Sequence, residues 1–213
     1  MNKRILIFSF IILQFLSSFH VDSLTQASEN YLKGRFYNSV KNHFLIATKK
    51  MNDSRFKKTV IVILENDEDG AWGLVINKLM GSIPLALLID SSTSTSEERE
   101  ALYKVHIPIY WGGPVDTKKI FILHSTEYQN ETTKSFGIIS ITADSKILID
   151  IAENKGPDKS LVILGYSGWG NGQLEGEMER DHWILSDLDI DIIFEKELNK
   201  KWPKAYKKSF IPL

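Results

Sequence analysis

The sequence predicts a single domain of mixed helices and strands. The chain has 213 residues, 43% of them hydrophobic and 25% charged, which is the composition of an ordinary globular protein. Short β-branched apolar runs such as residues 59–64 alternate with segments of helical period. We find no internal repeat and no linker long enough to separate two domains. One mixed domain is therefore the simplest architecture.

The first 27 residues predict a secretory signal peptide. Lys3 and Arg4 precede a twelve-residue stretch, 5–16, that only Ser9 and Gln14 interrupt. This stretch is too short to cross a bilayer, for which about 20 apolar residues are needed. A buried helix or an uncleaved anchor is the alternative. We expect a signal peptide at 1–27, a polar adapter at 28–42 and one domain at 43–213. The expected location is the periplasm or the exterior, with the cytoplasm as the alternative.

The first half of the domain is expected to hold three strands. Residues 44–47 form a short apolar strand, and the continuous run 59–64 is typical of a strand covered on both faces. An acidic turn at 65–70 leads to a strand at 73–77, which together predict a β-hairpin. Pro84 then opens a short helix.

The second half continues the alternation. Thr95 and Glu98 form a capping box for a helix that reaches about Lys104. Strands at 107–111 and 119–124 flank a glycine turn at 112–115. The remaining expectations are a strand at 136–142, a helix capped by Asp144 that ends near 156–157, a strand at 161–164, a helix from Gln173 to about Leu185 and a strand at 190–194.

Between the strand at 161–164 and the helix at Gln173, residues 165–172 contain four glycines. Such a run between a strand and a helix can cradle a phosphate, or it can mark a place where backbones pack closely. The Lys-Ser/Thr pair of a phosphate loop is missing. The carboxylates at 175, 177 and 179 occupy the place of an anion, and Asn171 can cap the helix. We therefore expect tight packing here.

An ordered set of motifs runs through the domain: Phe44-Leu45-Ile46-Ala47, Phe56-x-x-Thr59-Val60, Gly70-Ala71-Trp72-Gly73-Leu74-Val75-Ile76-Asn77, Gly112-Gly113-Pro114-Val115, Leu123-His124, and Gly165-Tyr166-Ser167-Gly168-Trp169 followed by Gly172-Gln173-Leu174-Glu175. This set resembles the YqgE/AlgH family of bacterial proteins over about residues 44–202. The resemblance implies an α+β fold in which a bent mixed β-sheet forms a pseudo-barrel with helices packed outside. No catalytic residues are established for the family.

The family name reflects an association with regulation of alginate production, which implies the label of transcriptional regulator. Three features depart from the family pattern. Lys49 stands where a proline commonly follows Ala-Thr, and Lys78-Leu79 stands where Arg-Pro is usual. The third is the export-like N-terminus, since family members are generally cytosolic. An exported protein cannot bind the chromosome, so this feature argues against the regulator label.

Composition excludes several kinds of chemistry. The chain has no cysteine, which removes disulfides, thiol nucleophiles and thiolate metal sites. The formal charge of -1 provides no field that would gather nucleic acid. The lysine-rich segment 196–208 carries interleaved aromatics and could bind single strands, but a solvated face explains it better. The acidic turn at 65–70 lacks the spacing of a calcium loop. We predict no cofactor and no metal.

Polar residues at strand ends and glycine turns are the candidate ligand contacts. They are Asn77, Gly112, Gly113, His124, Gln173 and Glu175. The favoured function is a non-enzymatic binding or regulatory module that recognises a small ligand or a protein partner. The alternative is a hydrolase or transferase in which His124 acts as general base, Glu175 orients it, and Asn77 or the amides of the glycine turn hold an oxyanion. A hydrogen-bonded structural histidine is the simpler interpretation of His124.

Overall fold

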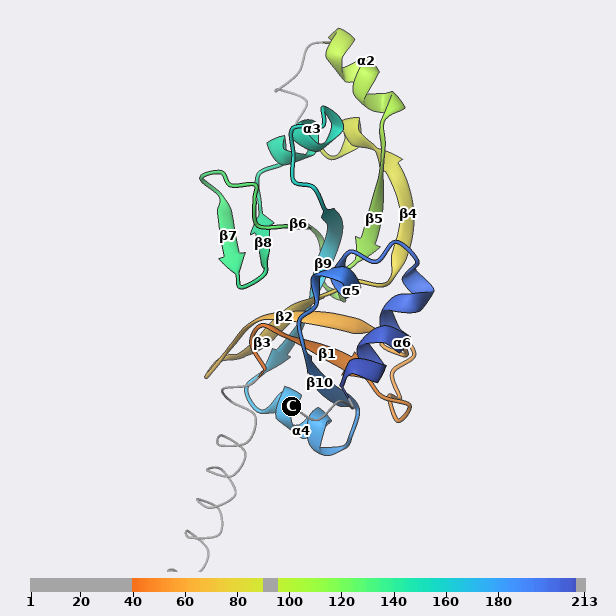
Figure 1. Ribbon diagram of the computed structural model, residues 1–213, viewed down its shortest axis with the longest axis vertical. Helices are drawn as coiled ribbons and strands as arrows, with labels where there is room; N and C mark the ends of the chain where they lie inside the picture. Colours follow the sequence, from red (N-terminus) through yellow and green to blue (C-terminus); the bar gives the residue numbers. More distant parts are fainter. Residues whose placement is uncertain (1–39, 90–95, 210–213) are drawn as a thin grey trace, which may run out of the picture. The chain divides into compact units, whose positions relative to one another are not determined.

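A curled, mostly antiparallel β-sheet organises the chain (Figure 1). The computed structural model describes residues 40–89 and 96–209. The predicted signal peptide, residues 28–39 of the adapter and the capping residue Thr95 lie outside the described residues. The strands are β1 (His43–Ala47), β2 (Val60–Asp67), β3 (Gly70–Val75), β4 (Leu79–Pro84), β5 (His106–Trp111), β6 (Val115–His124), β7 (Thr133–Phe136), β8 (Ile139–Thr142), β9 (Ser160–Gly170) and β10 (Trp183–Asp187).

The strand order is β10-β1-β2-β3-β9-β6-β8-β7, and the β4–β5 pair joins the sheet through β9. β9 is the strand on which the sheet turns. Its first half, through Leu164, pairs with β6 on one side and in parallel with β5 on the other. Its second half, from Ser167, pairs with β3 in place of β5. One strand therefore belongs to two parts of the sheet, which gives the fold its bend.

Side chains of the central strands fill two apolar clusters on opposite faces. On β6, Phe121 and Leu123 belong to the larger cluster, whereas Ile122 belongs to the smaller one. On β9, Ile163 and Val162 divide in the same way. This alternation follows from the two-residue period of a strand. Continuous apolar runs in the sequence thus mark strands that are covered on both faces.

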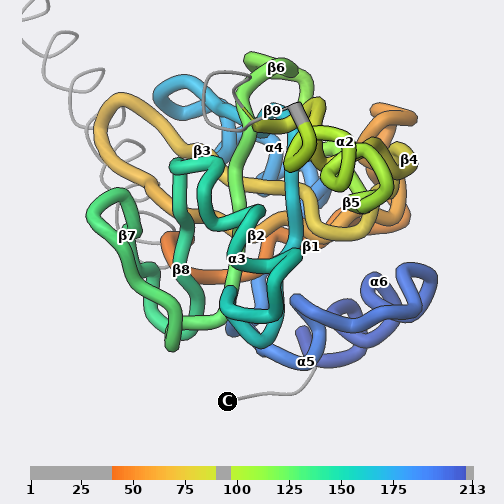
Figure 2. The backbone as a smooth tube through the Cα atoms, turned by 90° about the horizontal axis from the view of Figure 1, so that it is seen from above, coloured from red at the N-terminus to blue at the C-terminus, as the bar shows by residue number. Residues whose placement is uncertain are grey.

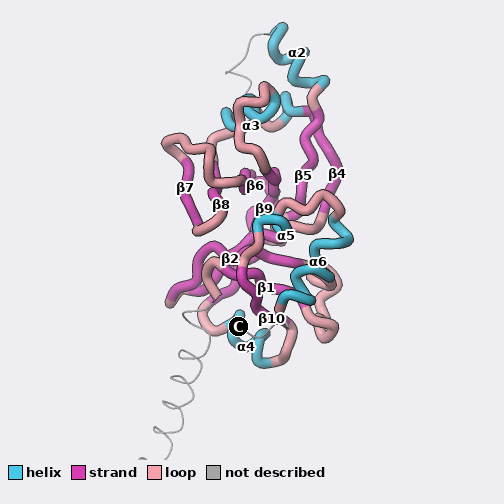
Figure 3. Tube along the Cα trace, viewed as in Figure 1, coloured by secondary structure: helices cyan, strands magenta, loops and turns pink. Residues whose placement is uncertain are grey.

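Helices flank the strands, as Figure 3 shows by its colours. They are η1 (Leu85–Leu87), α2 (Ser96–Lys104), α3 (Lys146–Ala152), α4 (Gln173–Glu179), α5 (Ile190–Ile193) and α6 (Leu198–Lys208). Seen from above in Figure 2, α5 and α6 lie along one side of the strands. Trp202 of α6 donates a hydrogen bond of 2.8 Å from its indole Nε1 to the carbonyl oxygen of Ala47 in β1. This bond ties the C-terminal helix to the sheet.

The α+β fold class and most of the predicted elements are confirmed. The hairpin around the acidic turn is formed by β2 and β3. The Asp144 carboxylate accepts a hydrogen bond of 2.9 Å from the amide of Lys146 at the start of α3, but the N-cap of this helix is Ser145 and the helix ends at Ala152, not near 156–157. The predicted strand at 136–142 is two short strands, because Gly137 adopts a φ of +65° and reverses the chain between β7 and β8.

The glycine run was expected to be a closely packed turn between a strand and a helix, and its residues 165–170 instead form the second half of β9. Its glycines serve close backbone packing. A Cβ on Gly113 (φ +152°) would lie 2.2 Å from the carbonyl oxygen of Tyr166, and one on Gly165 (φ +68°) would lie 2.8 Å from that of Gly113. Side chains cannot fit where two backbones approach this closely. Gly172, with a φ of +72°, takes the N-cap position expected for Asn171.

The C-terminal elements also differ from the prediction. The helix that begins at Gln173 ends at Glu179 and not near Leu185, because residues 183–187 pair with β1 as strand β10. The strand predicted at 190–194 is the helix α5, whose first turn is capped by Asp189 through a 3.0 Å bond from the amide of Asp191. The strand β4 and the helix α6 were not predicted.

Candidate functional site

His124 ends β6 and has no exposed surface. Its Nδ1 lies 2.8 Å from the carbonyl oxygen of Ser125, and its Nε2 lies 2.9 Å from Oγ1 of Thr142. Burial lowers the pKa of His124, so the ring is neutral at pH 7. Because a carbonyl can only accept, Nδ1 carries the proton and Nε2 accepts from Thr142. Both nitrogens are engaged within the protein.

Asn77 bridges two segments of backbone. Its side-chain oxygen accepts a 3.0 Å bond from the amide of Val60, and its nitrogen donates a 2.8 Å bond to the carbonyl of Lys58. Lys58 adopts a φ of +54°, and the bridge fixes this tight turn before β2. Asn77 and His124 bond to different partners, and no hydrogen bond joins these two residues.

Gly112 and Gln173 both relate to one hollow, Gly112 through its bond to Ser167 and Gln173 directly. The amide of Gly112 donates to Leu164, and its carbonyl accepts from the Oγ of Ser167 at 3.0 Å. Gln173 accepts from the amide of Gly170 and donates to Glu177, each at 3.2 Å. Ser167 and Gln173 both line the same hollow. Gly113 packs against the backbone of Tyr166. Glu175 belongs to α4 but does not line the hollow.

This hollow has a volume of about 350 Å³, and we call it the tryptophan pocket. It lies between the segment before β2, the second half of β9 and the connection from α4 to β10. Its lining residues are Met51, Asn52, Asp53, Arg55, Phe56, Pro114, Ser167, Gly168, Trp169, Gln173, Glu177, Arg180, His182 and Trp183. Segments that are far apart in the sequence therefore build one site.

A carboxylate held by two indoles forms one wall of the tryptophan pocket. Oε2 of Glu177 accepts hydrogen bonds from Nε1 of Trp169 at 3.1 Å and from Nε1 of Trp183 at 2.7 Å. The two indole rings meet edge to face with centroids 6.1 Å apart. Phe56 extends this wall, because its ring centroid lies 5.7 Å from that of Trp183. The result is a rigid aromatic wall, in which Trp169 and Trp183 are buried and Phe56 is half-buried.

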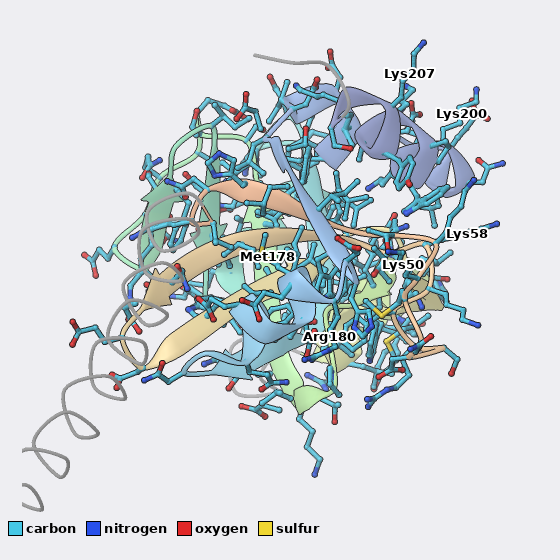
Figure 4. All side chains as sticks on the ribbon, turned by 90° about the horizontal axis from the view of Figure 1, so that it is seen from below. Lys50, Lys58, Met178, Arg180, Lys200 and Lys207 are labelled. Carbon is cyan, nitrogen blue, oxygen red and sulfur yellow. The ribbon has the colours of Figure 1, made fainter. Side chains whose placement is uncertain are left out.

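The charged groups of the pocket differ in their partners. Asp53 pairs with Arg55 at 2.6 Å, and the Arg55 guanidinium lowers the pKa of the Asp53 carboxyl. The side chains of Arg180 and His182, by contrast, form no hydrogen bond or ion pair with the described part of the chain. Figure 4 labels Arg180 at the end of α4, and Lys50 lies near it through an ion pair to Asp181 at 2.6 Å. Arg180 and His182 thus bring hydrogen-bond donors without a partner among the described residues to the pocket.

A family model described as AlgH-like matches residues 44–213. The chain belongs to the AlgH-like family. A UPF0301 protein of Methylococcus capsulatus is 36% identical to it, over 80% of this chain and 91% of the relative. A UPF0301 protein of Pseudoalteromonas translucida is 37% identical, over 78% of this chain and 89% of the relative. The predicted family is thus confirmed.

Two solved structures share the fold. The solution structure of the AlgH protein from Pseudomonas aeruginosa has a TM-score of 0.66 at 33% identity, covering 84% of this chain and 92% of that one. A crystal structure of a Corynebacterium diphtheriae protein has a TM-score of 0.61 at 14% identity, with 82% and 90% covered, and this likeness concerns the fold alone.

Motif residues of the AlgH-like family line the tryptophan pocket. Phe56 and Pro114 come from two separate motifs, Trp169 and Gln173 come from the glycine-rich one, and all four meet there. Sequence reasoning missed the other half of the site, above all Glu177, because a helix predicted through Leu185 hid the turn that brings Trp183 back toward Trp169. The tryptophans were the available signal, since an indole needs a partner for its N–H when it is buried.

The described residues hold no group of three or more His, Cys, Asp or Glu side chains placed to bind a metal ion. Within the same residues, no helix has the length and apolar character needed to cross a membrane.

Proposed function

We propose that this AlgH-like chain is a binding module whose tryptophan pocket recognises a small organic anion with a planar apolar body. The observation that carries the proposal is the imbalance of partners in the pocket. The two acids, Asp53 and Glu177, accept hydrogen bonds from neighbouring donors. The side chains of Arg180 and His182 have no hydrogen-bond acceptor among the described residues. A ligand that accepts hydrogen bonds would complete the site.

A carboxylate or a phosphate fits this requirement. A guanidinium presents a planar set of donors that matches either group with two parallel hydrogen bonds. Such charge-assisted bonds are stronger than neutral ones. The free donors of Arg180 would thus hold the anionic end of the ligand, with His182 as a second donor.

The aromatic wall suits the body of such a ligand. Trp183 is fixed by its bond to Glu177 and supports the half-buried ring of Phe56, and a rigid surface binds a planar ring without losing side-chain freedom. The volume of about 350 Å³ lies within the usual range for small-molecule sites, about 300–1,000 Å³.

Other functions have less support. A general base must reach its substrate, but His124 has no exposed surface and both its nitrogens are engaged. Segment 196–208 is poorly suited to bind nucleic acid, because four of its six lysines are paired with carboxylates or buried. Lys200, Lys204 and Lys208 form ion pairs, and Lys201 is buried. We also propose that the chain is exported, on the basis of its N-terminal sequence.

Titration with benzoate, phenyl phosphate and the neutral analogue benzyl alcohol tests the anion site. We expect at least one anion to shift the NMR signals of the Trp169 and Trp183 indole N–H groups and to raise the thermal midpoint. A ligand at 100 times its Kd stabilises a protein by about 2.7 kcal/mol. Benzyl alcohol should bind more weakly, because it cannot pair with Arg180.

The matched variants are Arg180→Gln and Lys50→Gln. Arg180→Gln removes a free donor of the pocket, so it should weaken anion binding at least about tenfold, the loss of one charge-assisted bond. Lys50→Gln removes a nearby charge outside the pocket and should leave binding within about twofold, since exposed ion pairs contribute little. Equal binding by wild type and Arg180→Gln, or no shift with either anion, would contradict the proposal.

A further inference from the structure

A second hollow lies beside β3 and β9. A role for it is independent of the function proposed above. The hollow has a volume of about 560 Å³, and we call it the aromatic hollow. Its floor is formed by Trp72, Phe121 and Tyr166. Its lining residues are Glu65, Asp67, Asp69, Gly70, Ala71, Trp72, Val115, Lys119, Phe121, Tyr166, Gly168 and Trp169.

The three rings of the floor are in mutual contact. The centroids of Trp72 and Phe121 are 5.6 Å apart at an interplanar angle of 38°. Tyr166 stands nearly perpendicular to both, at 77° to Trp72 and 80° to Phe121. Two rings inclined to each other and a third across them form a concave aromatic surface. Such surfaces attract cations through the negative faces of the rings.

Gly168 helps keep this surface open. In the β3–β9 ladder it lies directly opposite Trp72, and neighbouring positions of a ladder share one face of the sheet. A Cβ at Gly168 would lie 3.3 Å from Cε2 of Tyr166 and 3.8 Å from Cγ2 of Val115. A side chain at this position would therefore project into the aromatic hollow.

Charged groups around the floor favour a cation. The lining holds the carboxylates of Glu65, Asp67 and Asp69 against the single amine of Lys119. Oε2 of Glu65 accepts a 2.8 Å hydrogen bond from Nε1 of Trp72, which fixes this carboxylate next to the floor. An organic cation would gain from both the rings and the negative charge.

The chain already places an ammonium group on this surface. Nζ of Lys119 lies 5.2 Å from the ring centroid of Phe121. Lys119 is exposed, and among the described residues its amine forms no ion pair. Its contact with the ring is the kind that a ligand can replace, since an exposed cation–π contact is weak.

From these contacts, we propose that the aromatic hollow binds an organic ammonium ion and that Lys119 is its internal competitor. The ligand class is a small molecule with a primary to quaternary ammonium group. Carboxylates and ring faces recognise the charge, and the apolar substituents of the cation pack on the indole and phenol rings.

Choline and its neutral isostere 3,3-dimethyl-1-butanol provide the decisive comparison. The two have the same shape, but only choline carries a charge. We expect choline to quench the fluorescence of Trp72 and shift its indole N–H signal in NMR, and to bind at least about tenfold more tightly than the isostere. Equal binding of the two, or no binding of choline, would overturn the proposal, because the floor would then be only an exposed part of the apolar core.

Variants separate the contributions. Lys119→Gln removes the competitor and should tighten choline binding several-fold. Glu65→Gln keeps an oxygen that accepts from the Trp72 indole but removes the charge, so it should weaken binding several-fold. Gly168→Val fills the hollow and should abolish binding. Its control is Gly170→Ala on the same strand, whose Cβ would meet nothing within 4 Å, and binding should be unchanged.

A further control distinguishes this site from the anion site. Arg180→Gln, which is expected to impair the tryptophan pocket, should leave choline binding unchanged. If Arg180→Gln weakens choline binding or Lys119→Gln does not tighten it, the cation does not occupy the aromatic hollow and the proposal fails. A failure of benzoate to bind would bear only on the tryptophan pocket.

Discussion

At the scale of single residues, Lys201 is the most unusual charged group. It has no exposed surface, and its Nζ donates to the carbonyl oxygens of Ile76 at 2.9 Å and Ile193 at 2.6 Å. Nζ also lies 5.7 Å from the ring centroid of Tyr110. Lys201 thus connects α6 to the end of β3 and to α5 through backbone oxygens, without a carboxylate in direct contact.

Burial lowers the pKa of Lys201 from an ordinary 10.5 to about 8, and Glu195 opposes this shift. Between these values the unfolded chain binds a proton that the native chain does not, so the native state gains stability as the pH rises. Relative to Lys201→Met, the free energy of unfolding of the wild type should increase by roughly 3 kcal/mol from pH 7.5 to pH 10.5. Urea denaturation of both proteins measures this. A constant difference would contradict it.

His124 is expected to make the free energy of unfolding depend on pH below pH 7. Because burial lowers its pKa below 6.5, the unfolded chain takes up a proton first as the pH falls. The stability that neutral His124 provides is complete above pH 6.5 and is lost below it. His124→Gln should therefore cost about 1–3 kcal/mol at pH 7 through its broken hydrogen bonds and progressively less toward pH 5. Denaturation curves at pH 7, 6 and 5 check this, and an equal loss at all three would refute it.

At the scale of elements, β9 determines how the sheet turns. Gly165 lies where β9 leaves β5 and joins β3, and its backbone meets the Gly112-Gly113 turn. The amide of Gly112 donates to Leu164 at 2.8 Å, and its carbonyl accepts from Val75 at 3.1 Å. The glycine turn therefore joins the two parts of the sheet through main-chain bonds.

Gly113→Ala should be severely destabilising, by at least about 3 kcal/mol in the free energy of unfolding. The added methyl would fall 2.2 Å from the carbonyl oxygen of Tyr166, and a φ of +152° is itself unfavourable for alanine. Gly170→Ala is the control, because open space surrounds its Cβ, and we expect a change within about 1 kcal/mol. Comparable losses in the two variants would show that close packing at the turn is not what requires glycine.

Elements also show where sequence patterns reach their limit. The β-branched run of β2 identified its strand because continuous apolar residues suit a strand that is buried on both faces. Residues 190–193 are also apolar except for Asp191, but they form α5, since Asp189 caps the first turn. Short apolar runs are compatible with either structure, and a local contact selected the helix.

At the scale of the whole molecule, both candidate sites lie beside the second half of β9. Gly168 and Trp169 line the tryptophan pocket and the aromatic hollow. The first offers free hydrogen-bond donors, and the second offers carboxylates and ring faces. The proposed module would thus bind an organic anion and an organic cation at distinct sites.

The proposed export of the chain is a property of the whole molecule. We expect cleavage near Ala27 and recovery of the native protein from the periplasm or the medium. N-terminal sequencing combined with cell fractionation measures both. An intact chain in the cytoplasm would contradict export and restore the possibility of a role at the chromosome.

The sequence by itself determined the family, the α+β class, most of the early strands and the need for close packing at its glycines. These features follow from local composition and period, which a short segment carries within itself. Only the tertiary structure decided that the glycine run is a strand, that residues 183–187 pair with β1, and that Glu177 meets two indoles. These outcomes depend on partners far away in the chain, and no local pattern specifies which distant backbone or side chain will satisfy a given hydrogen bond.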